Sequence, residues 1–249
     1  MAVKKLPNAP LHEVIFEAFW ELDPSADGGK VLDSRFSFAL GKFQEKIKED
    51  FPEVVQLYPK DLPHQFLPYQ TMYQFWKGKN QWPVLQIGPG IFAVNDTDKD
   101  YEWEKKYYPL VKTNLRKLSD AYQEINFISA SLRYIDVVRV KDYGFTNWRD
   151  FILKHLNFSF ENHFDSMGEL VKLNFDQSFD LKEKGLLNLT ISNGKNNKNE
   201  DILTWQTSVK VKNNMDEKAL LHWLNSAHEC TSDIFKRICK KDFYESFSK

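Results

Sequence analysis

The sequence predicts an α+β protein in which helices cover one face of an antiparallel sheet. Several segments alternate apolar and polar residues, which is typical of half-buried strands. These segments follow one another through short turns, as hairpin-linked antiparallel strands do. The order strand–helix–three strands–helix occurs twice along the 249 residues. Together these observations favour a twisted sheet with its long helices on the same side.

Composition limits the class of protein. Hydrophobic residues make up 42% of the chain and aromatic residues 15%, which is enough for a packed core and excludes a disordered chain. The formal net charge of −1 argues against bulk attraction to nucleic acid or to an anionic membrane. No apolar stretch reaches the roughly 18 residues that a membrane helix needs, and residues 1–10 lack the apolar run of a signal peptide. We therefore expect a soluble, cytoplasmic protein.

The first half begins with a strand, because residues 12–22 alternate between apolar and polar side chains. Residues 23–30 read as a loop, and residues 34–50 as a helix with Ser34 as a possible N-cap. After a connection interrupted by prolines we expect three strands, over residues 69–76, 82–87 and 91–94. A helix over residues 101–124 should follow them. Pro109 inside that helix predicts either a kink or a short first turn ahead of the main helix.

The second half repeats this order of elements. Residues 127–140 read as a strand and residues 147–156 as a short helix. Three further strands follow, over residues 170–181, 186–192 and 202–212. A closing helix covers residues 216–243. The loop over residues 193–199 begins with Asn-Gly, is otherwise polar, and is expected to be mobile.

The repeated order predicts two α+β halves, residues 1–125 and 126–249, that together form one compact globular unit. The period is roughly 115 residues, and it rests on element order rather than on residue identity. The layout resembles the duplicated fold of the TATA-box-binding protein, an analogy that concerns the fold alone.

Alternation also assigns the faces of the second-half sheet. The apolar face should be buried under helices; its expected members are Val171, Leu173, Phe175, Leu187, Leu189, Ile191, Leu203, Trp205 and Val209. Asp136 falls among apolar residues of its strand, where a carboxylate needs a partner or is strongly disfavoured by desolvation. Arg133 falls on the opposite face of a regular strand. Asp136 is therefore the best candidate for a buried polar residue, either as a structural acceptor or as part of a site.

Four short motifs occur in order along the chain: residues 6–11 followed by Glu13, residues 86–90 running to Asn95, Tyr101-x-Trp103, and residues 132–136. Their order and spacing resemble a sporadically distributed, functionally uncharacterised family of prokaryotic proteins of about this length. The resemblance implies no known activity or cofactor, and patchy distribution suggests a mobile or defence-associated gene neighbourhood. From the residues themselves, Gly88-Pro89-Gly90 predicts a tight turn, and Asn95 or Asp96 a cap toward the next helix.

No catalytic signature is present. None of the six histidines lies in a helical metal-binding spacing, and the glycines form no phosphate loop, so we expect neither a metal nor a cofactor. Successive members of the Glu13, Glu17 and Glu21 series lie ~13 Å apart on one strand face, too far for a hydrolytic carboxylate pair.

Three classes of function remain. The one favoured is a non-enzymatic binding module for a protein partner or a small ligand. An enzyme is the alternative, with a site assembled from Arg133, Asp136, Tyr101 and Asn95. The third class is a weak nucleic-acid binder that uses lysines on its helices, because the mixed charges of the open sheet face do not suit phosphates. No membrane contact is expected.

Overall fold

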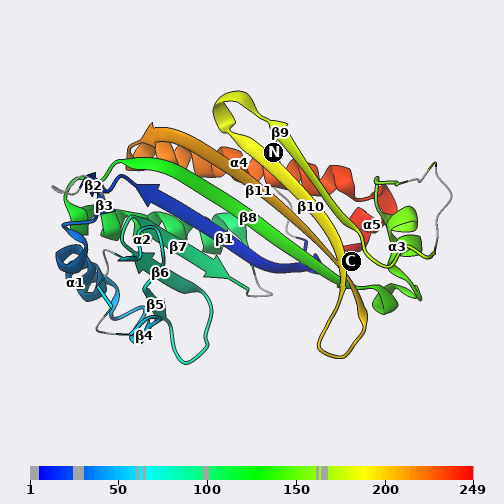
Figure 1. The fold of residues 1–249 in the computed structure, drawn as a ribbon, viewed down its shortest axis with the longest axis horizontal. Coiled ribbons are helices and arrows are strands. Elements are labelled where there is room, and N and C mark those ends of the chain that lie inside the picture. The colour runs from blue at the N-terminus through cyan, green and yellow to red at the C-terminus, as the bar shows by residue number, and fades with distance from the viewer. Residues whose placement is uncertain are drawn as a thin grey trace. The chain divides into compact units, whose positions relative to one another are not determined.

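The computed structural model describes residues 6–24, 31–59, 62–63, 66–97, 101–160, 163 and 168–248. The strands are β1 (Leu11–Trp20), β2 (Asp23–Pro24), β3 (Val31–Leu32), β4 (Glu53–Gln56), β5 (Tyr73–Trp76), β6 (Val84–Gly88), β7 (Ile91–Asp96), β8 (Phe127–Arg139), β9 (Asn174–Asp180), β10 (Leu186–Lys195) and β11 (Asp201–Met215). The helices are α1 (Phe36–Ile47), α2 (Tyr108–Tyr122), α3 (Trp148–His155), α4 (Glu217–Ile238) and α5 (Lys241–Ser246) (Figure 1).

The predicted fold class is confirmed. Among the residues that the structure describes, nine strands form one antiparallel sheet in the order β4-β5-β6-β7-β1-β8-β11-β10-β9, and β2 and β3 form a separate pair. In this order β1 neighbours β7, the last strand of its half, and β8 likewise neighbours β11. The strand order is therefore the one that a duplication requires, although β4 has no counterpart in the second half. The duplication itself stays a prediction.

The chain divides into two compact units that do not coincide with the expected halves. Unit 1 comprises Met1–His12, Arg133–Val209 and Ala227–Lys249, and unit 2 comprises Glu13–Leu132 and Lys210–Ser226. The bounds differ because β8, β11 and α4 each run through both units. Each unit is described by itself below.

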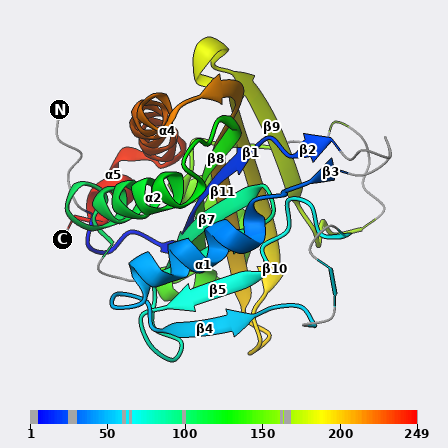
Figure 2. The ribbon, with the colours of Figure 1, turned by 90° about the vertical axis from the view of Figure 1, so that its left-hand side faces the viewer.

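In unit 2 the helices cover one face of the strands. The alternation of β1 places Val14, Phe16 and Ala18 at 0% exposure on this face. The Phe43 ring of α1 packs edge-on against Phe92 of β7, with 5.7 Å between ring centroids. Figure 2 shows α1 and α2 side by side, and Arg116 of α2 pairs with Glu217 at the start of α4 at 3.2 Å. The long helices therefore lie on the same side in this unit, as predicted.

Several predicted boundaries in unit 2 were wrong. Ser34 is not the N-cap, because α1 begins at Phe36 and Arg35 occupies the N-cap position. Ser34 Oγ donates to the Asp23 carboxylate instead. Strand β4 lies in the region expected to be a connection. For Pro109 the second of the two predicted alternatives is confirmed, because the short π-helical turn η2 (Trp103–Tyr107) precedes α2 and Pro109 lies in the first turn of that helix.

Unit 1 has its own core, which is rich in aromatic residues. Ile191, Leu203 and Trp205 are at 0% exposure, and Phe151 of α3 packs edge-on against Phe243 of α5. The closing helix ends before the predicted Phe243, because Asn157 Nδ2 donates to the carbonyl groups of Arg237 and Cys239 and so satisfies the end of α4.

The predicted burial of the second-half strands holds for most positions but fails at one edge. Val171 is 78% exposed, because β9 begins only at Asn174 and Val171 precedes it. Phe175 is half-buried because β9, the outermost strand of the sheet, has a neighbour on one side only, and Leu173, just ahead of this strand, is half-buried as well. The remaining six expected residues are buried.

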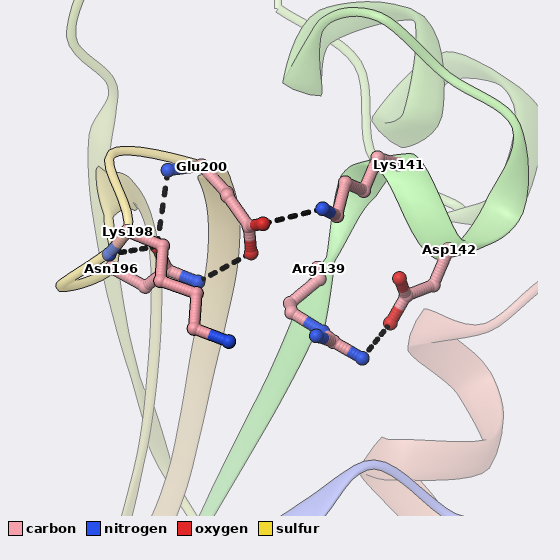
Figure 3. A network of polar contacts seen from close by, with 6 residues as sticks. All are labelled: Arg139, Lys141, Asp142, Asn196, Lys198 and Glu200. Atoms are coloured by element: carbon pink, nitrogen blue, oxygen red, sulfur yellow. Dashed lines mark hydrogen bonds and ion pairs between the residues drawn. The ribbon is translucent and has the colours of Figure 1, made fainter.

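The loop between β10 and β11 is held by a polar network rather than left free. Asn196 Oδ1 accepts from the backbone N–H groups of Lys198 and Glu200, and Asn196 Nδ2 donates to the Glu200 carboxylate (Figure 3). Glu200 also pairs with Lys141, and this hydrogen bond is the main reason why the pKa of Glu200 is lowered. These contacts order the loop in the structure, whereas its mobility stays a prediction.

Candidate functional site

The face of unit 2 that points away from the helices carries the candidate site. In the strand register, Gln74 of β5 lies opposite Gln86 of β6, and Gln86 lies opposite Ala93 of β7. Asn95 lies two residues beyond Ala93, and so shares its face of β7. Glu13 and Glu17 occupy the same face of β1, since Glu17 lies opposite Ala93. Residues distant in sequence are thus brought together by strand pairing.

Four hydrogen bonds join these side chains into one continuous row. Trp76 Nε1 donates to Gln74 Oε1 at 3.2 Å, and Gln74 Nε2 donates to Gln86 Oε1 at 3.0 Å. Gln86 Nε2 then donates to Asn95 Oδ1 at 2.9 Å, and Asn95 Nδ2 donates to Glu13 Oε1 at 2.8 Å. We call Trp76, Gln74, Gln86, Asn95 and Glu13 the polar row.

Every bond in the polar row is donated in the same direction, toward Glu13. A carboxylate only accepts hydrogen bonds, so Glu13 fixes the orientation of the Asn95 amide, and each amide then fixes the next. Bonds aligned in this way polarise one another, and the bond to a charged acceptor is the strongest kind. After these bonds each amide group still has a second N–H and a second lone pair on its oxygen. The row is therefore a preorganised array of donors and acceptors.

The hairpin between β6 and β7 positions two members of the row. Gly90, at φ +78°, makes the turn, and its backbone N–H donates to the buried carboxylate of Asp33. A Cβ at Gly88 would lie 1.8 Å from the Gln70 carbonyl oxygen, so the chain can approach only at a glycine. The tight turn predicted from Gly88-Pro89-Gly90 is therefore confirmed, and it sets the register between Gln86 and Asn95.

The row is accessible along most of its length. Asn95 is 9% exposed, whereas Gln74, Gln86, Glu13 and Trp76 are half-buried. The half-buried Trp82 packs edge-on against Trp76, with 5.1 Å between ring centroids. The amide end of the row thus adjoins a pair of indole rings, and the neighbouring side chains restrict the rotamers of the row.

Charges of both signs surround the row. Strand β1 contributes Glu13 and Glu17 to this face, Glu21 follows one residue past its end, and Glu53 of β4 lies opposite Trp76. Strand β11 contributes Lys210 and Lys212 by its own alternation. Glu17 accepts a hydrogen bond from Ser131 Oγ at 2.8 Å. The surface therefore has no strong field of either sign.

The structure does not gather the four residues predicted as a site. Asn95 belongs to the polar row; it lies within β7 and not at a helix start, so the capping prediction was wrong for both Asn95 and Asp96. The Tyr101 ring packs against the Tyr107 ring, with 5.6 Å between ring centroids. Arg133 is half-buried and follows Ser131 by two residues on β8, whereas Asp136 lies on the opposite face of that strand.

Asp136 is buried in the core of unit 1, as the alternation predicts, at 4% exposure. Burial raises the pKa of its carboxyl group to about 8, and the Trp205 indole N–H partly offsets this rise. Burial likewise raises the pKa of the neighbouring Cys239 thiol to about 12. A carboxyl group enclosed in this way is protonated at neutral pH and cannot reach a substrate in solvent, so the geometry makes Asp136 a structural acid.

A cleft of about 750 Å³ in unit 2 is lined by residues that include Arg35, Ser119, Gln123 and Glu217. Two of its charged side chains are engaged within the protein: Arg35 donates to the Glu124 carbonyl oxygen at 2.7 Å, and Glu217 pairs with Arg116. The arrangement stabilises the end of α2 and offers no nucleophile with an adjacent base.

The described ranges contain no cluster of three or more His, Cys, Asp or Glu side chains that could hold a metal ion. Within the same residues, no helix is both long and apolar enough to span a bilayer.

Sequence reasoning placed Glu13 on the open face and named Asn95 as a candidate site residue, but it missed Gln74, Gln86 and Trp76. Gln74 and Trp76 alternate with the buried Phe75, and Gln86 lies between the buried Leu85 and Ile87, so the signal of their faces was present. No signal in the sequence revealed the register that aligns these side chains across four strands.

Comparisons with known proteins give no match to a protein family, a curated protein or a solved structure. The resemblance of the four motifs therefore stays a prediction.

Proposed function

We propose that the protein is a non-enzymatic binding module, located in the cytoplasm, that uses the polar row of unit 2 to hold a polar ligand. The observation that carries this proposal is the shared orientation of the row, in which Glu13 fixes three amide groups that still have hydrogen-bonding capacity. Preorganised polar groups beside aromatic rings are the usual composition of a small-ligand site. Side chains that only solvate a sheet face do not need a common orientation.

Geometry supports binding rather than catalysis. Glu13 and Glu17 lie four residues apart on one strand, or ~13 Å, which exceeds the separation of a catalytic carboxylate pair. Asp136, the carboxyl group with the most strongly raised pKa among those described, is enclosed in the core of unit 1. The carboxylates around the row outnumber the lysines of its face, which supports a ligand other than nucleic acid.

The test is a nuclear magnetic resonance screen that observes side-chain amide groups directly. We expect polar fragments that bind to shift the NH₂ resonances of Gln74, Gln86 and Asn95. The amides of Gln44 and Asn213, which are exposed outside the row, should stay in place as internal controls. Fragments that bind but leave the three row amides unmoved, or a library in which nothing moves them, would contradict the proposal.

A further inference from the structure

We infer that the ligand of the polar row is a short, uncharged oligosaccharide, which the protein holds without cleaving it. This inference rests on the proposed function and names the chemical class of its ligand. It follows from the hydrogen-bonding capacity of the row, its aromatic end, its length and its charge.

The hydrogen-bonding capacity of the row selects hydroxyl groups. Each of Gln74, Gln86 and Asn95 keeps one donor and one acceptor after the bonds within the row are made. A phosphate or carboxylate only accepts, and an ammonium group only donates, so each would leave half of this capacity unused. A sugar hydroxyl both donates and accepts, and neighbouring hydroxyls of one ring can satisfy the two functions of an amide.

The aromatic end of the row suits the apolar face of a sugar ring. Trp76 and Trp82 are both half-buried, so their indole rings keep exposed surface next to the Gln74 amide. Trp76 Nε1 is held by Gln74, which restrains the ring in its position. Large rigid aromatic rings bury contact area at a small cost in conformational entropy, and pyranose C–H groups pack against such rings.

The length of the row indicates more than one sugar unit. From Gln74 on β5 to Glu13 on β1 the row crosses three strand spacings, or ~14 Å. A single pyranose ring covers only part of this distance, whereas a disaccharide or trisaccharide matches it. The tryptophan pair would hold one end of the ligand and the Glu13 carboxylate would accept hydrogen bonds at the other.

Charge favours a neutral sugar over an acidic one. The row contains three neutral amides and the Glu13 carboxylate, and Glu17 of β1 and Glu53 of β4, which lies opposite Trp76, share its face. Lys210 and Lys212 offset only part of this negative charge, so the surface gives no net attraction for sulfated or phosphorylated glycans. The ~13 Å spacing of successive carboxylates is too long for the double displacement or single displacement of glycosidases.

The experiment is a calorimetric titration with maltohexaose, cellohexaose, chitohexaose and mannohexaose, and with a heparin hexasaccharide as the anionic comparison. We expect at least one neutral hexasaccharide to bind, and heparin to bind at least tenfold more weakly. The Gln86→Leu and Trp82→Ala variants should each weaken that binding by about tenfold or more, since each removes a polar or a stacking contact. The Gln44→Leu variant, changed on the exposed surface of α1, should bind as the wild type does.

Several outcomes would overturn the inference. They are the absence of binding by every neutral hexasaccharide up to about 10 mM, tighter binding of heparin, unchanged binding in both row variants, or release of shorter sugars on long incubation. If polar fragments still shift the row amides while no saccharide binds, the binding module stands and its ligand is of another class. If the fragments also fail, the proposed function fails with the inference.

Discussion

Replacing Asp136 with Asn tests the buried carboxyl group of unit 1 through the pH dependence of stability. The pKa of Asp136 is about 8 in the folded protein, against the ordinary aspartate pKa of 3.8 that applies when the chain unfolds. Below pH 3.8 the carboxyl group is protonated in both states and contributes no pH dependence. Between these two values the folded state retains a proton that the unfolded state has released, so wild-type stability falls as the pH rises.

The size of the effect follows from linkage. Each pH unit in this window lowers the free energy of unfolding of the wild type by about 1.4 kcal/mol, and asparagine does not titrate. Between pH 5 and pH 7 the variant should therefore gain about 3 kcal/mol relative to the wild type. Burial lowers the pKa of His228 to about 3 and raises that of Cys239 to about 12, but both residues are present in the wild type and the variant, so their own contributions to the pH dependence cancel in the difference.

The assay is urea denaturation of both proteins at pH 5, 6, 7 and 8. Asp242→Asn is the matched control, because Asp242 is exposed at the start of α5 and its variant should follow the wild-type pH profile. A stability difference between Asp136→Asn and the wild type that stays constant from pH 5 to pH 7 would refute the reasoning. Such a result would mean that water or a donor reaches the carboxylate and keeps it ionised.

Three further predictions concern stability, loop order and selectivity. Asp33→Ala removes the acceptor of two buried side-chain donors and one backbone N–H, and should lower the free energy of unfolding by roughly 3–5 kcal/mol in urea denaturation; a loss below about 1 kcal/mol contradicts this. Asn196→Ala should speed hydrogen exchange at the backbone amides of Lys198 and Glu200, whereas equal protection in both proteins would mean that the loop is held otherwise. Duplex and single-stranded oligonucleotides should show no sub-micromolar binding at about 150 mM salt that depends on the open face of unit 2, and the row variant Gln86→Leu checks this.

The elements that could be predicted from the sequence are those whose side chains alternate strictly. Strand β1 was found because its apolar residues face the helices without interruption. Strand β4 was missed because Val54 and Val55 are both more than 40% exposed, so an edge strand carries no alternation to detect. The boundary of α1 was misplaced because Ser34 Oγ donates a hydrogen bond to the Asp23 carboxylate, a tertiary contact that no local pattern reveals.

The candidate site was predictable in part for a similar reason. Alternation placed Glu13 on the open face and Asp136 in the core, and both positions are confirmed. The hydrogen bonds of Gln86 to Gln74 and Asn95 depend on register, which the sequence does not specify residue by residue. Asn95 was interpreted as a helix cap because asparagine is common there, but β7 extends two residues further than its apolar run.

The central claim is that the polar row is a binding surface whose orientation is set by Glu13. It is tested most directly by following the side-chain NH₂ resonances of Gln74, Gln86 and Asn95 during titration with the tightest-binding neutral hexasaccharide, in the wild type and in Glu13→Ala. The account predicts saturable shifts of all three amides in the wild type and at least tenfold weaker binding in the variant, because loss of the terminal acceptor frees the amides to rotate. Shifts confined to other parts of the chain, or equal affinity in the two proteins, would contradict it.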